Sequence, residues 1–240
     1  MVMKERPNPR KSYVLKRGQY DQPDKTQQVF SGTPAFLPEM KKGAPKNRLG
    51  LARWLVDPKN PLTARVAVNR YWQHFFGIGI VATPEDFGVQ APLPSHPRLL
   101  DWLAFEFVRS GWNVKAIQKK IVMSATYRQA SNATPEEFRA DPKNRTLGRG
   151  PRFRLGAEQI RDNALAVSGL LKEKIGGPSI KPYQPAGLWR ELAGGSGQGP
   201  YRMDSDDNIY RRSLYIYRKR TVPHPTMTTF DAGSREICQV

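Results

Sequence analysis

Residues 47–90 constrain the fold more than any other part of the chain, because they contain two helix patterns separated by a proline hinge. Asn47 is a good N-cap, and the apolar residues after it recur at helical spacing. Pro58 ends this first helix, since the residue before a proline is disfavoured in the helical region. The second helix begins near Pro61, where the missing N–H costs nothing, and ends at Gly77.

The second helix pattern has two chemically different faces. Arg65, Asn69 and Gln73 fall four residues apart, so they form a polar ladder on one face. The other face carries an apolar stripe, made of Ala64, Ala67, Val68, Tyr71, Trp72, Phe75 and Phe76. We therefore expect this helix to be buried along the stripe.

Further amphipathic patterns predict a mainly α fold. Ser95 is expected to be the N-cap of a helix that closes at Gly111, and Asn113 caps the next one. The sequence also predicts helices after Thr134, over residues 157–171 and around residues 188–192. With 21 prolines and 20 glycines, the chain must contain long irregular loops between these helices.

Alternating residues predict only a minor β element. Residues 212–218 carry the clearest strand pattern, and residues 12–18 carry a weaker one. Residues 1–46 are otherwise basic and rich in proline, so we expect an irregular arm there. Residues 47–240 are expected to form one mainly helical domain. It is expected to be truncated at its C-terminus, because no closing element follows Glu236.

The charge balance favours an anionic partner. The chain has 39 Lys and Arg against 21 Asp and Glu, a net charge of +18. Such an excess favours phosphate, sulfate, nucleic acid or an acidic surface, although it also suits a piece of a protein whose other parts are acidic. A single cysteine, Cys238, excludes an internal disulfide and a cysteine-cluster metal site. Neither a signal peptide nor an apolar run of about 18 residues is visible.

Three residues are the candidates for catalysis: Asp86, His224 and Asp231. Asp86 follows the aromatic helix in a loop, where it could be a general base or a cation ligand, or could simply cap a turn. His224 lies between two prolines and is the most site-like histidine. His74 and His96 are too distant from it in sequence to suggest a metal motif, so no metal site is predicted.

A second set of side chains is the candidate for ligand binding. Several arginines lie beside apolar residues, where a planar guanidinium could bind carboxylate, sulfate or phosphate through two N–H groups. The same forks could instead hold backbone carbonyls and acidic turns in place. The candidates are Arg65, Asn69, Arg70, Arg128, Arg161 and Arg212.

Several long segments, which follow one another along the chain, resemble those of a known family. They include RLGLARWLVDPKNPLTARVAVNRYWQHFFGIGIVATPEDFGVQ, SHPRLLDWLAFEFVRSGWNVKAIQKKIVMSATYRQAS and GPRFRLGAEQIRDNALAVSGLL. From about residue 13 onward, the chain resembles the planctomycete-type domain of unknown function fifteen-fifty-three. This is the C-terminal domain of large exported multidomain proteins.

The resemblance implies a periplasmic or secreted protein with a haem-binding cytochrome c-like domain upstream. This chain has no Cys-x-x-Cys-His sequence, so haem c is implied only for that missing domain. The upstream domains are the partners that the resemblance implies. It supplies no catalytic residues that can be carried over by position.

Three functions remain open at this stage. The first is an accessory or binding domain of an exported cytochrome c-associated protein that binds an anionic polysaccharide. The second is a redox or hydrolytic enzyme domain acting on polysaccharide, which requires the three catalytic candidates to converge. The third is nucleic-acid binding through a basic surface, although no recognised motif accompanies the charge.

Overall fold

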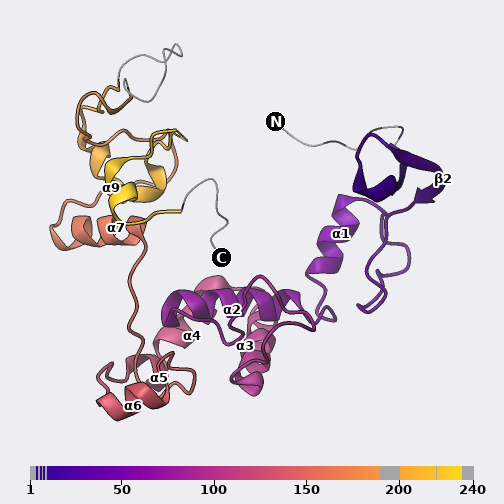
Figure 1. Ribbon diagram of the computed structural model, residues 1–240, viewed down its shortest axis with the longest axis horizontal. Coiled ribbons are helices and arrows are strands. Elements are labelled where there is room, and N and C mark those ends of the chain that lie inside the picture. Colours follow the sequence, from indigo (N-terminus) through magenta and orange to yellow (C-terminus); the bar gives the residue numbers. More distant parts are fainter. Residues whose placement is uncertain are drawn as a thin grey trace. The chain divides into compact units, whose positions relative to one another are not determined.

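A computed structural model describes residues 4, 6, 8, 10–189, 201–219 and 221–233 (Figure 1). The chain divides into two compact units, Met1–Pro151 and Arg152–Val240. Helices are the main regular structure of both units, and the single sheet among the described residues has two strands. The prediction of a mainly α fold with a minor β element is therefore confirmed. No helix in the described ranges is long and apolar enough to cross a membrane.

A β-hairpin occupies part of the arm that was expected to be irregular. Strand β1 (Ser12–Leu15) confirms the weaker strand pattern, and it pairs antiparallel with β2 (Pro23–Val29). A 3-10 turn, η1 (Lys16–Gly18), connects them through the positive φ angles of Arg17 and Gly18. Strand β2 was not predicted, because the sequence PDKTQQV has no apolar alternation.

Helix α1 (Arg48–Leu55) packs against the end of the arm. The Asn47 side chain accepts a hydrogen bond from the Gly50 N–H, as its capping pattern predicted. Trp54 is buried, and its indole N–H donates to the Pro38 carbonyl at 2.6 Å. A Cβ atom at Gly50 would lie 1.8 Å from the Pro45 carbonyl oxygen, so only glycine allows this close approach.

Helices α2 (Thr63–Phe76), α3 (Pro97–Arg109) and α4 (Val114–Val122) form the core of the first unit (Figure 1). The apolar stripe of α2 is buried as predicted, and the rings of Trp72 and Phe76 stack at 4.0 Å. Phe107 of α3 and Ile117 of α4 pack into the same core.

Local capping explains most of the helix boundaries in this unit. Asn113 caps α4, as the sequence predicted, and α6 (Pro135–Ala140) confirms the predicted short helix, which begins with a capping box of Thr134 and Glu137. The prediction that Ser95 caps α3 is wrong, because His96 is the N-cap residue and the Ser95 N–H bonds the Ile80 carbonyl. The short helix α5 (Ala125–Arg128) was not predicted.

The second unit has shorter elements. It contains α7 (Ala157–Val167), α9 (Pro225–Thr229) and two 3-10 turns, η2 (Asp207–Tyr210) and η3 (Ser213–Tyr215). Helix α7 is shorter than the predicted helix over residues 157–171. The predicted helix around residues 188–192 lies mostly outside the described residues.

The strand predicted over residues 212–218 is wrong. This segment forms η3, and Ile216 makes only an isolated parallel bridge to Ile180. A second isolated bridge joins Lys172 to Arg211. The segment is held by side chains from other parts of the unit, which the alternation of apolar residues does not encode.

Candidate functional site

Arg211 is a buried arginine that holds two segments of the second unit together. Its side chain is 2% exposed, and its guanidinium donates to the carbonyl oxygens of Lys174, Gly176 and Pro178. The guanidinium also lies 3.8 Å from the centre of the Tyr215 ring. A buried cation with this many acceptors fixes the loop around Gly176 against the segment that contains η3.

Arg161 of α7 fixes the same segment from the other side. It donates to the carbonyl oxygens of Ile209 and Arg211 at 2.8 and 2.9 Å, and burial lowers the pKa of its guanidinium. The neighbouring Asp162 accepts from the Ser213 N–H at 2.7 Å and from Arg212 at 3.2 Å. The two ligand-binding candidates of this unit are Arg161 and Arg212. Both therefore donate to groups of the protein itself, Arg161 to backbone carbonyls and Arg212 to Asp162.

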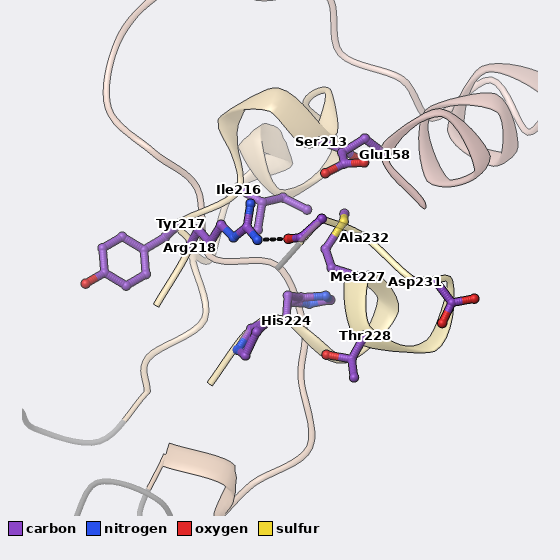
Figure 2. Close-up of a pocket in the computed structure, with 12 residues that line it drawn as sticks. Glu158, Ser213, Ile216, Tyr217, Arg218, His224, Met227, Thr228, Asp231 and Ala232 are labelled. Carbon is purple, nitrogen blue, oxygen red and sulfur yellow. Dashed lines mark hydrogen bonds between the residues drawn. The ribbon is translucent and has the colours of Figure 1, made fainter. Parts of the chain in front are cut away.

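A cavity of about 360 Å³ lies beside α9 (Figure 2). Its lining comes from α7, from residues 213–218 and from residues 223–233. The residues that matter for its chemistry are Glu158, Ser213, Arg218, His224, Thr228 and Asp231. This cavity gathers two of the three candidate catalytic residues.

His224 is the most unusual side chain of the cavity. The residue is 8% exposed, and its Nε2 donates to the Tyr183 carbonyl at 2.8 Å. Within the described residues, its buried Nδ1 has no hydrogen-bond partner. Burial lowers the pKa of His224 below its usual 6.5, so the imidazole is neutral at pH 7. A neutral ring that donates through Nε2 has a lone pair on Nδ1.

Asp231 shares the cavity but is occupied elsewhere. Its carboxylate pairs with Arg154 at 2.7 Å, and its side chain is 76% exposed. Its φ of +58° lies in the left-handed region, which aspartate tolerates better than most residues. Among the described residues, no hydrogen bond joins His224 to a carboxylate, so no acid–histidine pair forms here.

Asp86 belongs to the first unit. Its side chain accepts from the Gly88 N–H at 2.7 Å, while its carbonyl accepts from the Thr83 hydroxyl. These contacts are those of a residue that caps a turn, the alternative interpretation of Asp86. Only His224 and Asp231 therefore share one cavity.

Asn69 is fully buried rather than part of an exposed ladder. Its side-chain amide donates to the Val81 carbonyl at 3.0 Å and accepts from the Val81 N–H at 2.9 Å. Arg145 completes this clamp by donating to the Gly79 and Ile80 carbonyls at 2.6 and 2.7 Å. The amide of Asn69 holds the turn after α2, and Arg145 was not predicted to take part.

The other candidates of the first unit lie on the surface. Arg65 pairs with Asp101 at 2.7 Å and also donates to the Pro61 carbonyl. Arg70 and Arg128 are exposed. No group of three or more metal-ligating side chains occurs among the residues that the structure describes.

A cluster of rings and cations forms a second feature of the C-terminal unit, which we call the aromatic–lysine patch. It consists of Lys181, Trp189, Tyr201, Tyr217 and Lys219. Trp189 lies 5.1 Å from Tyr201 and 5.8 Å from Tyr217, between ring centres. Lys219 lies 4.3 Å from the centre of the Trp189 ring, and Lys181 lies 5.4 Å from that of Tyr217.

The patch combines flat apolar faces with positive charge. Burial raises the pKa of Tyr201 to about 12, with a further contribution from Asp204, so this phenol is neutral. The patch was not predicted from the sequence, because its members are spread over residues 181–219. The feature of the sequence that could have indicated the patch is the presence of tyrosines and a tryptophan in a loop-rich region.

The described residues thus form a basic, mainly helical protein whose second unit has a cavity of mixed polar and apolar lining and an aromatic–lysine patch. The chain belongs to the PSD1 family, described as a protein of unknown function (DUF1553), which it matches over residues 47–240. Searches of curated proteins and of solved structures found no match.

Proposed function

We propose that this chain is an accessory or binding domain that holds an anionic polysaccharide through the aromatic–lysine patch. The observation that carries the proposal is the placement of Lys219 and Lys181 over aromatic rings. Sugar rings present apolar C–H faces that pack on aromatic side chains, and their sulfate or carboxylate groups attract ammonium groups. A patch with both features matches both parts of such a polymer.

The overall charge supports the same partner. A net charge of +18 raises the local concentration of a polyanion and speeds its encounter with the protein. Because this attraction is screened by salt, it steers the polymer to the surface without fixing its orientation. The rings of Trp189 and Tyr217 would supply the orientation.

We further propose that the chain works in an exported protein, in the periplasm or outside the cell, beside upstream domains of the same protein. Membership of the PSD1 family is compatible with an exported protein domain. Haem c would belong to an upstream domain, and no residue of this chain is proposed to hold it.

The test is to measure the affinity of the full chain for four polymers: a sulfated dextran, a carboxylated polygalacturonate, neutral dextran and single-stranded DNA. We expect binding to one or both anionic polysaccharides that weakens with NaCl, and weak binding to neutral dextran. Replacing both Lys181 and Lys219 with Gln should weaken binding about tenfold, since two lysine–anion contacts of about 0.7 kcal/mol each are lost.

The matched control removes the same charge elsewhere. Lys115→Gln with Lys119→Gln alters two exposed lysines on α4 and should change affinity less than about twofold. Equal losses in the two double variants would show that net charge alone attracts the polymer and would contradict a role for the patch. Stronger binding to DNA than to every polysaccharide would favour the nucleic-acid alternative.

A further inference from the structure

We infer that the cavity beside α9 is a separate binding site for a neutral, hydroxyl-bearing ring, with the ligand hydroxyl donating to Nδ1 of His224. The inference does not depend on polysaccharide binding at the aromatic–lysine patch. Three features carry it: the unpartnered Nδ1, the mixed lining of the cavity and its size.

The chemistry of His224 selects a hydrogen-bond donor. The Tyr183 carbonyl can only accept, so Nε2 of His224 carries the proton and Nδ1 is an acceptor. Although His224 is the N-cap residue of α9, its side chain does not cap the helix. A buried polar atom without a partner costs stability, and a ligand hydroxyl would remove that cost.

The cavity lining favours an uncharged ligand. Charges of both signs surround His224, with the carboxylates of Glu158 and Asp231 in the lining and the guanidinium of Arg161 close enough to disfavour its protonation. Two of the charged side chains in the lining have other partners, since Asp231 bonds Arg154 and Arg218 donates to the Gly233 carbonyl (Figure 2). A lining that carries charges of both signs favours an uncharged polar ligand over an anion or a cation.

The remaining surfaces suit one small ring. Ile216, Pro223 and Met227 supply apolar contacts, and the hydroxyl of Thr228 can bond a second polar group. A volume of about 360 Å³ lies near the lower end of the range for ligand pockets, about 300–1,000 Å³. Such a ring could be a phenol or a sugar, which share a hydroxyl on a ring with apolar surfaces.

The cavity and the patch are distinguishable sites. Tyr217 belongs to both, but its ring points away from the other labelled residues of the cavity lining (Figure 2). A ligand in the cavity therefore need not contact Trp189 or Lys219. Variants of the two sites can be tested independently on the same full chain.

The direct test is ¹⁵N NMR of histidine side chains in the unaltered full chain. Phenol and methyl glucoside are titrated separately, and anisole, which has no O–H, is the control for phenol. We expect the Nδ1 resonance of His224 to move with phenol, with the glucoside or with both, which identifies the ring type. No movement with either probe, or equal movement with anisole, would overturn the inference.

A pair of variants separates the two ring nitrogens of His224. His224→Gln keeps an N–H donor near the position of Nε2 and removes the Nδ1 acceptor, so binding of the active probe should weaken about fivefold to tenfold. His224→Asn places an amide oxygen near the position of Nδ1 and should retain more of the affinity. Unchanged binding by His224→Gln would contradict the assignment, while its binding of sulfated dextran should equal that of the parent.

Discussion

At the scale of single residues, Asn69 shows how one buried amide fixes a turn. It makes two hydrogen bonds to Val81, and Gly79 lies so close that a Cβ atom there would be 2.6 Å from its Nδ2. Asn69→Ala would leave both Val81 groups buried without a partner. We expect a loss of about 2–4 kcal/mol in the free energy of unfolding, measured by urea denaturation.

The control for Asn69 lies next to it on the same helix. Arg70 is exposed, so Arg70→Ala should change the free energy of unfolding by less than about 0.5 kcal/mol. If Asn69→Ala were equally mild, the clamp would not contribute to stability.

Glu106 is the residue through which the first unit should respond to acid. It is 7% exposed, and it bonds Arg109 at 2.8 Å and Lys120 at 2.7 Å. The two cations lower the pKa of Glu106 from 4.5 to about 2. Because the folded pKa lies below the unfolded one, this carboxylate stabilises the fold above pH 4.5, and its contribution is lost as the pH falls toward 2.

Thermal melts of the parent and Glu106→Gln over that pH range test this expectation. The variant should have a lower Tm than the parent at pH 7, and the difference should shrink as the pH approaches 2. Glu136→Gln is the control, since Glu136 is 73% exposed and lies 3.6 Å from Arg139. A difference in Tm that stays constant with pH would mean that the ion pairs of Glu106 are not the cause.

Several single residues were misjudged for a shared physical reason. Helical spacing correctly put Arg65 and Asn69 on related faces of α2, but it carries no information about which turn of the chain covers that face. The partners of Asn69 and of Arg161 are backbone groups that come close only after folding. Residue type alone therefore could not separate a ligand-binding arginine from one that holds carbonyls.

At the scale of elements, Arg211 connects two loops that have little regular structure. Its guanidinium reaches carbonyls of Lys174, Gly176 and Pro178 at once, which a single ammonium group cannot reproduce. Arg211→Lys should therefore lower the free energy of unfolding by about 2–4 kcal/mol, as followed by chemical denaturation.

Arg212 provides the matched control for that substitution. Its side chain is 61% exposed and bonds Asp162, so Arg212→Lys should cost less than about 1 kcal/mol. Equal costs at the two positions would contradict the structural role of Arg211.

Elements fixed by contacts between residues close in sequence were predicted correctly, and those fixed by contacts between distant residues were not. The caps at Asn47, Asn113 and Thr134 were predictable, because each side chain bonds a backbone group three residues away. Residues 212–218 alternate like a strand but form a turn, because Asp162 holds the Ser213 N–H from about 50 positions earlier. Long-range contacts of this kind override a local pattern.

At the scale of the whole molecule, the chain divides into two compact units at Pro151. Composition suggested the change at residue 46, where proline-rich basic sequence gives way to helices. The division by contacts instead groups the hairpin and α1–α6 into one unit. The aromatic–lysine patch and the cavity both belong to the second unit.

The candidate sites were predictable only in part at this scale. His224 and Asp231 were recognised as loop residues with reactive groups, and they line one cavity. The cavity itself depends on Met227, Ile216 and the course of the chain, which the sequence does not encode locally. The patch was missed because no pattern links residues 181, 189, 201, 217 and 219 before folding.

The central claim is that the aromatic–lysine patch binds an anionic polysaccharide. The most direct measurement is an NMR titration of the full chain with a sulfated oligosaccharide, following the five tryptophan indole N–H signals. Trp189→Phe identifies the signal of Trp189. We expect this signal to move on titration, while that of Trp72, which is 4% exposed in the core, does not. A bound oligosaccharide that leaves the Trp189 signal unmoved would contradict the claim.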